Sequence, residues 1–155
     1  TMRSEARANA LVLAGSAALL GGALLSQFVG GLFPCEMCYW QRWPHLAAIA
    51  LGLLAWALGS NRALTALAAI AVLVSGAIGV FHAGVEYHWW EGVTTCTAAP
   101  ITGSTSEVLG SIMATPLIRC DAAQWTLFGI SLAGYNAILS GLIGGGALWL
   151  LRKPR

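Results

Sequence analysis

Long uncharged stretches separated by short charged segments divide the chain into candidate helices. Four stretches are free of charge and rich in apolar residues: 8–30, 43–59, 63–85 and 125–151. A helix needs roughly 20 such residues to cross the hydrocarbon core of a bilayer. Because lipid offers no partner to backbone N–H and C=O groups, these stretches are expected to form helices and not open strands. The pattern predicts an all-α membrane protein, a four-helix transmembrane bundle in one domain over residues 1–155.

The basic residues indicate the orientation of the bundle. One side would carry Arg3, Arg7, Arg62, Arg152, Lys153 and Arg155, and the other only Arg42 and Arg119. The positive-inside rule then places both termini in the cytoplasm and the loops 31–42 and 86–124 on the opposite side. A cleaved signal peptide is the alternative for the first stretch, which is however longer than the usual apolar region of such a peptide.

The loop 86–124 is much longer than a connection between packed helices requires, and loops of that kind are usually functional or disordered. Within it, Ser104 and Glu107 have the spacing of a capping box. An apolar face follows, and Pro116 ends the run; the face consists of Val108, Leu109, Ile112 and Met113. This pattern predicts a short amphipathic helix in the membrane interface. A frayed surface turn is the alternative.

Small residues recur at four-residue spacing in two of the predicted helices. The stripes are Ala18, Gly22 and Ser26 in the first, and Ala71, Ser75, Gly79 and Ala83 in the third. Such stripes let helix backbones approach closely in lipid. We expect both stripes to serve helix packing.

Composition narrows the class of protein further. Apolar types make up 57% of the chain and charged residues only 9%, whereas a typical soluble domain carries about 25% charged residues. The net charge of +2 is too small to indicate nucleic-acid binding. Any chemistry is therefore expected on the helices or their loops, next to the lipid bilayer.

All four cysteines fall in the predicted outer loops, at positions 35, 38, 96 and 120. In an oxidising compartment an even number of cysteines indicates disulfides, and four cysteines allow three pairings. The Cys-x-x-Cys spacing favours Cys35 with Cys38, which leaves Cys96 with Cys120. A bridge across Cys35-Glu-Met-Cys38 closes too small a loop to stabilise much. Its position points to redox chemistry instead of structural support.

The pair Cys35 and Cys38 lies just before the second predicted helix. At a helix N-terminus, the dipole and the free N–H groups favour a thiolate. Arg42 follows Cys38 by four residues, so the two side chains are expected on one helix face. Its charge would lower the thiolate pKa and stabilise negative charge on an electron acceptor. The alternative role for Arg42 is that of an interfacial anchor.

Two metal-based alternatives fit the pattern less well. Strong zinc signatures pair two Cys-x-x-Cys elements, and the chain has one, so no metal site is expected. Covalent haem attachment needs a histidine directly after the motif, where the chain has Tyr39. A haem between His45 and His82 remains conceivable. His82 would otherwise be a polar residue satisfied in helix packing or part of the wall of a cofactor pocket.

Two disulfides at a membrane surface can pass electron pairs by thiol–disulfide exchange. An external dithiol would reduce the loop disulfide, and the loop dithiol would then reduce Cys35–Cys38. The sequence has no dinucleotide-binding motif, so the acceptor is expected to come from the membrane. A lipid quinone, which takes two electrons, fits this position beside Cys38 and Arg42.

These residues resemble the disulfide bond formation protein B (DsbB) family of bacterial thiol:quinone oxidoreductases. The resemblance rests on Pro34-Cys35-x-x-Cys38-x-x-x-Arg42, on the later pair Cys96 and Cys120, and on Gln124-Trp125 leading into Phe128-Gly129. Four spans with both termini inside agree with it, so it covers essentially the whole chain. One departure is Glu36, because the family commonly has apolar residues between these cysteines. A carboxylate there would raise neighbouring thiol pKa values.

The resemblance implies a protein of the bacterial inner membrane whose active site faces the periplasm. It would reoxidise DsbA, a periplasmic thioredoxin-fold oxidase, and pass the electrons to ubiquinone or menaquinone. Cys35 and Cys38 would be the quinone-facing pair, with Cys38, Arg42 and His82 around the quinone. Cys96 and Cys120 would exchange with the partner, Cys120 forming the first mixed disulfide. A disulfide-stapled membrane subunit without activity and a haem-binding electron carrier are the competing hypotheses.

Overall fold

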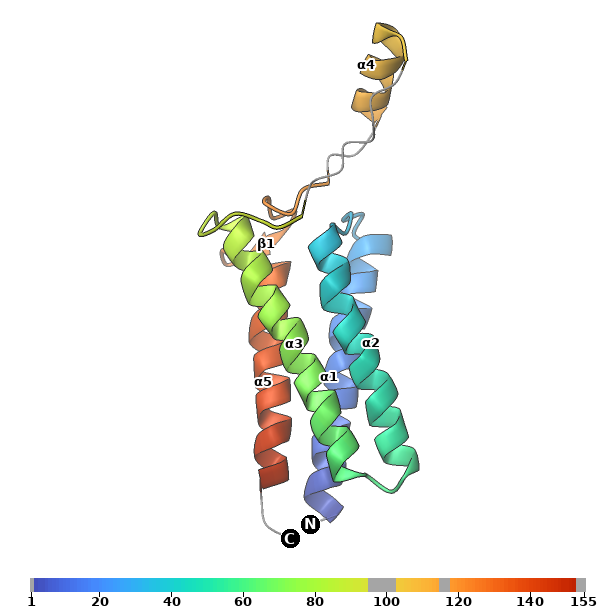
Figure 1. The fold of residues 1–155 in the computed structure, drawn as a ribbon, viewed down its shortest axis with the longest axis vertical. Coiled ribbons are helices and arrows are strands. Elements are labelled where there is room, and N and C mark those ends of the chain that lie inside the picture. The colour runs from blue at the N-terminus through green and yellow to red at the C-terminus, as the bar shows by residue number, and fades with distance from the viewer. Residues whose placement is uncertain (1, 95–102, 115–117, 153–155) are drawn as a thin grey trace.

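The computed structural model describes residues 2–94, 103–114 and 118–152, and helices dominate it. Four long helices lie side by side, α1 (Met2–Phe28), α2 (Glu36–Ala57), α3 (Arg62–Glu86) and α5 (Leu132–Arg152), and Figure 1 shows them as one bundle. The other elements are the short helix α4 (Thr105–Ala114) and the two-residue strands β1 (Thr126–Leu127) and β2 (Ile130–Ser131). Cys96 lies outside the described residues.

Within the part of the chain that the structure describes, three helices are long and apolar enough to cross a membrane: Arg3–Phe28, Arg62–Glu86 and Leu132–Arg152. This finding supports the predicted all-α membrane protein. The predicted span 43–59 falls in α2, which is not among the three. The N-terminal half of α2 carries Gln41, Arg42 and His45, and these polar residues lower its hydropathy. They are also the residues that build the site described below.

The helix ends differ from the predicted ones most clearly at the fourth stretch. We predicted a helix over 125–151, but α5 begins at Leu132, after a hairpin in which β1 pairs with β2. The turn residues Phe128 and Gly129 have positive φ angles of 51° and 76°, which no helix allows. The Tyr87 hydroxyl donates to the Gly129 carbonyl at 2.8 Å. Because the residues around this turn are mostly apolar, the hydropathy pattern did not distinguish them from the helix that follows.

The other predicted stretches agree with helices at shifted ends. The stretch 63–85 corresponds to α3, whose first turn is capped by Asn61 through a 3.1 Å hydrogen bond from the Leu64 N–H to Oδ1. The stretches 8–30 and 43–59 correspond to α1 and α2, which begin six and seven residues earlier and each end two residues before the predicted end. Because α2 starts at Glu36, the first turn of the helix contains Cys38.

The end of the bundle where α1 begins and α5 ends, here the terminal end, is packed from small apolar side chains. Figure 1 places the start of α1, the end of α5 and the α2–α3 turn together at this end. The buried cluster consists of Ala8, Val12, Ala48, Ala68, Ala69, Val72, Ala147 and Leu151. At Gly144 an added Cβ would come within 2.9 Å of the Ala69 carbonyl oxygen. The helices α3 and α5 therefore approach as closely as their backbones allow.

The predicted helix in the loop 86–124 is present as α4. The Ser104 backbone N–H donates to Glu107 Oε2 at 2.9 Å, and the Ser104 hydroxyl donates to the same oxygen at 2.6 Å. This contact lowers the pKa of Glu107, chiefly through the hydroxyl. The carboxylate thus anchors the start of the helix as the capping-box spacing indicated.

Candidate active site

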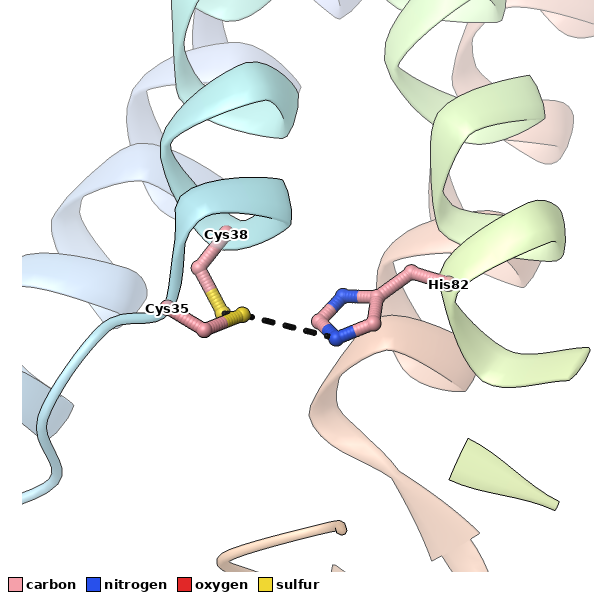
Figure 2. Close-up of side chains that lie close together, drawn as sticks. All are labelled: Cys35, Cys38 and His82. Carbon is pink, nitrogen blue, oxygen red and sulfur yellow. Dashed lines mark hydrogen bonds between the residues drawn. The ribbon is translucent and has the colours of Figure 1, made fainter. Parts of the chain in front are cut away.

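The two cysteines of the Cys-x-x-Cys motif meet at the start of α2. Cys35 is the N-cap residue with extended backbone angles, and its carbonyl accepts from the N–H of Cys38 at 3.1 Å. The two Sγ atoms are thiols 3.1 Å apart, and Figure 2 shows both side chains turned toward His82. Cys35 is buried, and Cys38 is partly exposed. The predicted placement of both cysteines at a helix N-terminus is confirmed.

The two thiols have opposite pKa shifts. The hydrogen bond to Cys38, helped by burial, raises the pKa of Cys35 to about 12. The same hydrogen bond lowers the pKa of Cys38, although burial and the charge of Glu86 oppose that shift. Cys35 therefore keeps its proton and shares it with Cys38, which is the sulfur that ionises first. An asymmetric pair of this kind has one nucleophilic sulfur.

His82 and Glu86 of α3 face the pair from the other side. His82 Nε2 lies 3.5 Å from Cys35 Sγ, as the dashed line in Figure 2 marks. Glu86 Oε1 lies 3.7 Å from the same nitrogen, and the carboxylate side chain is 8% exposed. Its other oxygen, Oε2, has no hydrogen-bond partner among the described residues. Glu36 is exposed, so Glu86 is the carboxylate closest to the chemistry.

Cys120 belongs to the same buried cluster as Cys35, Met37 and Val85. Burial raises the pKa of Cys120, and its interaction with Cys35 acts in the same direction. Two hydrogen bonds fix the segment after Cys120. Gln124 Oε1 accepts from the Phe33 N–H at 3.0 Å, and Gln124 Nε2 donates to the Phe33 carbonyl. One loop thiol is therefore placed directly beside the pair on α2.

A cavity of about 740 Å³ opens beside the thiols. Its walls are mostly apolar, and its polar residues include Cys35, Cys38, Arg42 and His82. A pocket of this size and character is typical of small-molecule and cofactor sites. Cys38, Arg42 and His82, which were predicted to lie around a quinone, all line this cavity, and their binding role stays a prediction.

Arg42 is held at the wall of this cavity and does not contact the thiols. Its guanidinium donates to Gln27 Oε1 at 2.6 Å and to the Ala23 carbonyl at 3.3 Å. It also lies 5.2 Å from the centre of the Tyr39 ring. The Arg42 guanidinium therefore has a fixed position, from which it can interact with a molecule bound in the cavity.

The two small-residue stripes have different roles. In α3, Ser75, Gly79 and Ala83 are buried against neighbouring helices, as expected for packing. In α1 the predicted packing role is wrong, because Ala18 and Gly22 are exposed to the cavity and line it with Ser26. The small side chains there leave space instead of closing it.

The donor atoms of Cys35, Cys38 and His82 lie within 4.8 Å of one another and could hold a metal ion. The spacing argument against zinc considered cysteines alone and missed this histidine. The haem alternative loses support. Both ring nitrogens of His45 have partners, Asn136 Oδ1 at 3.0 Å and Ser16 at 3.3 Å. Those of His82 face Cys35 and Gln41.

Sequence reasoning missed three residues of the site: Gln41, Glu86 and Asn136. Gln41 Nε2 lies 2.8 Å from His82 Nδ1, and Asn136 Nδ2 donates to Gln41 Oε1 at 2.9 Å. A polar residue inside a predicted span is by default a candidate for function, and that signal was available for Asn136, whereas Gln41 fell in the predicted loop 31–42. Glu86 was treated only as the charged end of the third stretch.

Fold and site together define a class: a helical membrane protein whose paired thiols lie at the mouth of an apolar cavity. Comparison with known families is more specific. Residues 5–150 match the family described as "Disulfide bond formation protein DsbB", so the chain belongs to the DsbB family of membrane oxidoreductases of disulfide formation.

Individual relatives agree with this assignment. The chain is 31% identical to a disulfide bond formation protein B of Polaromonas naphthalenivorans, over 95% of the chain and 91% of the relative. It is 29% identical to one of Verminephrobacter eiseniae, over 92% and 83%. An uncharacterized protein of Rickettsia prowazekii is 24% identical over 85% and 79%. No solved structure matches the chain.

Proposed function

We propose that this protein is a thiol:quinone oxidoreductase of the bacterial inner membrane. It reoxidises a periplasmic thioredoxin-fold oxidase similar to DsbA and passes the electrons to ubiquinone or menaquinone. One observation carries the proposal: Cys120, the pair Cys35 and Cys38, and the apolar cavity with Arg42 adjoin one another in that order. Disulfide exchange and electron transfer to a lipid-soluble acceptor need these parts in sequence.

The first exchange involves the loop pair. A thiolate of the partner attacks Cys96 in the disulfide Cys96–Cys120, and Cys120 leaves with the electron pair. We expected from the sequence that Cys120 would form the mixed disulfide with the partner. The burial of Cys120, which is 6% exposed beside Cys35, favours Cys96 for that role, because a protein partner needs an accessible sulfur.

The second exchange passes the electrons to α2. The Cys120 thiolate attacks Cys35 of the Cys35–Cys38 disulfide, and Cys38 takes the electron pair. The second thiol of the partner then releases Cys96, and the partner leaves oxidised. Cys96 attacks Cys120, the Cys96–Cys120 disulfide reforms, and Cys35 leaves as a thiolate.

The quinone is the final acceptor. Cys35 and Cys38 reform their disulfide and give up two electrons, which a quinone bound in the cavity would accept together with two protons, the same number that the partner dithiol loses. Cys38 faces the cavity and ionises more readily than Cys35, so it makes the contact with the quinone. Arg42 donates to a quinone carbonyl, where negative charge develops.

The proposed topology follows the charge pattern. Four helices span the membrane, both termini are cytoplasmic, and the loops 31–42 and 86–124 are periplasmic with α4 at the interface. The polar N-terminal half of α2 is supported by neighbouring helices, as polar residues at membrane depth require. Its hydrogen bonds reach α1 through Arg42 and α5 through Gln41.

Turnover with purified components tests the proposal. Reduced thioredoxin-fold partner and a short-chain quinone in detergent should yield oxidised partner and quinol. Replacing Cys35 or Cys38 by Ser should abolish quinol formation. Cys96→Ser and Cys120→Ser should block oxidation of the partner and leave quinone binding intact. Full turnover by Cys38→Ser would contradict the mechanism, whereas no quinol with the wild-type protein would favour a disulfide-stapled subunit without activity.

A further inference from the structure

A buried chain of polar side chains leads from Cys35 into the bundle. All four long helices contribute to it: Ser16 on α1, Gln41 and His45 on α2, His82 on α3 and Asn136 on α5. Polar groups in an apolar interior are costly unless they are hydrogen-bonded. The proposed electron path uses none of these side chains, so the chain calls for a further explanation.

The orientation of Asn136 is fixed by a backbone carbonyl. Its Nδ2 lies 3.2 Å from the carbonyl oxygen of Ser75, which can only accept a hydrogen bond. The same nitrogen donates to Gln41 Oε1 at 2.9 Å. The Asn136 amide therefore holds the oxygen of Gln41 toward α5.

The orientation of Gln41 determines which nitrogen of His82 carries the proton. Gln41 Nε2 donates to the Met37 carbonyl at 3.2 Å, which again fixes the amide. Its other contact, to His82 Nδ1 at 2.8 Å, is then also a donation. A neutral imidazole that accepts at Nδ1 carries its proton on Nε2. That proton faces Cys35 Sγ at 3.5 Å.

We propose that Gln41 and Asn136 are positioning residues that hold His82 in its Nε2–H tautomer, so that His82 donates a hydrogen bond to the sulfur of Cys35 and stabilises its anion. The inference rests on the proposed function, because the anion matters when Cys35 leaves its bond to Cys120. In that step Cys96 attacks Cys120, the Cys35–Cys120 bond breaks, and the electron pair goes to Cys35. Donation to the leaving sulfur favours the step.

The surroundings of Cys35 make this donor important. The titratable groups that face it are Cys38 on α2, His82 and Glu86 on α3, and Cys120 on the adjoining segment. Among the described residues the nearby cation Arg42 is directed to Gln27 and Ala23. His82 is thus the group that can favour a thiolate at Cys35, and it opposes the pKa increase caused chiefly by the hydrogen bond to Cys38.

The tautomer can be observed directly. In reduced protein with ¹⁵N-labelled histidine, protonated and bare ring nitrogens have well-separated shifts. We expect His82 to show a protonated Nε2 and a bare Nδ1, and Gln41→Met to abolish this preference. A protonated Nδ1 with a bare Nε2 in the wild-type protein would overturn the proposal. Neither quinone nor partner takes part, so failure here is distinguishable from failure of the proposed function.

The reactivity of Cys35 supplies a second test. In a protein whose sole cysteine is Cys35, the pH profile of alkylation reports its thiol pKa. His82→Ala removes a hydrogen bond to a charged group, so the rate below that pKa should fall about tenfold. Gln41→Met should shift the profile in the same direction.

Gln41→Glu separates positioning from packing. A carboxylate accepts from His82 Nδ1–H and stabilises the doubly protonated imidazolium, whose Nε2–H still faces Cys35, so at a pH where this imidazolium persists the alkylation rate should stay at or above that of the unsubstituted sole-cysteine protein. A purely structural role predicts the opposite order, since a buried carboxylate costs more than a methionine of similar size. Ser140→Ala is the matched control, because Ser140 contacts Asn136 Oδ1 and not the Nδ2 that donates to Gln41. An unchanged profile in Gln41→Met, or a slower rate in Gln41→Glu than in Gln41→Met, would overturn the proposal.

Discussion

The terminal end of the bundle and the end that carries Cys35, here the dithiol end, use the same four helices in different ways. At the terminal end, Ala, Val and Leu side chains fill the space between helices, and Gly144 permits close backbone contact. At the dithiol end, the helices enclose a cavity of about 740 Å³ and a chain of hydrogen-bonded polar side chains. The terminal end is closely packed and contributes stability, whereas the dithiol end has less apolar packing.

The difference shows how a small membrane protein can place chemistry at a lipid surface. Close packing at the terminal end fixes the helix positions, and hydrogen bonds at the dithiol end then fix side-chain orientations. Substitutions at the terminal end should therefore change stability, whereas substitutions at the dithiol end should change reactivity.

The largest expected effect is the difference in reactivity between the two thiols of α2. The pKa of Cys35 is raised to about 12 and that of Cys38 is lowered, and only the thiolate reacts. At pH 8 reduced protein should be alkylated at Cys38 at least about thirtyfold faster than at Cys35, after allowance for the lower nucleophilicity of the more acidic thiol. Peptide mapping after timed labelling measures the ratio.

The sign of the pH dependence is part of this prediction. As the pH rises toward 12, Cys35 ionises and the ratio should shrink. In Cys35→Ala the hydrogen bond from the Cys35 thiol is lost, so the pKa of Cys38 should rise toward that of an ordinary thiol. Equal labelling of Cys35 and Cys38 at pH 8 would remove the basis for assigning them different roles.

The next effect concerns Arg42. Arg42→Met removes a charged donor from the cavity wall, and a hydrogen bond to a developing charge contributes about 1.5–3 kcal/mol. The quinone KM should rise at least about tenfold while the KM for the partner stays nearly constant. Arg62→Gln, at the opposite end of the bundle, is the control and should change neither. A quinone KM that Arg42→Met leaves unaltered would count against the assigned role.

At the terminal end the expected effect is on stability alone. The Cβ introduced by Gly144→Ala would meet Leu73 Cγ at 2.6 Å and the Ala69 carbonyl oxygen at 2.9 Å. Overpacking of this kind costs about 1–3 kcal/mol, and thermal unfolding in detergent should show it as a lower Tm. Gly145→Ala is the matched control, because nothing lies within 4 Å of its added Cβ. Equal Tm values for the two variants would contradict the close approach of α3 and α5.

The smallest effect is expected at α4, which belongs to neither end of the bundle. Ser104→Ala removes the hydroxyl that holds Glu107, so the pKa of Glu107 should rise toward its ordinary value. The amides of the first turn of α4 should exchange several-fold faster, as for the loss of other N-cap residues. Hydrogen exchange of α4 peptides measures this change. Turnover should stay the same, and a large loss of activity would assign α4 a role that its described contacts do not suggest.

The sequence allowed the chemistry of the dithiol end to be predicted from local signals. Cys35, Cys38 and Arg42 lie in one stretch of eight residues at the start of α2, so their spacing alone places them together. The capping box of α4 is equally local. In each case the prediction depended on contacts between residues within one or two helical turns.

Contacts between distant segments were not predictable in this way. Gln41, His82 and Asn136 come from three helices, and only the packed bundle brings their side chains together. The turn at Phe128 and Gly129 lies inside an apolar stretch, so hydropathy extended the fourth helix through it. The α1 stripe was misassigned because small residues can border a cavity as well as a helix contact.

The central claim is that the Cys35–Cys38 pair delivers electrons to a quinone in the cavity beside it. Anaerobic mixing of fully reduced protein with a stoichiometric amount of short-chain quinone, followed by quinone absorbance and thiol counting, tests it most directly. The account predicts one quinol for each Cys35–Cys38 disulfide formed and no quinol with folded Cys38→Ser protein. A quinone that stays oxidised while the wild-type pair stays reduced would contradict it.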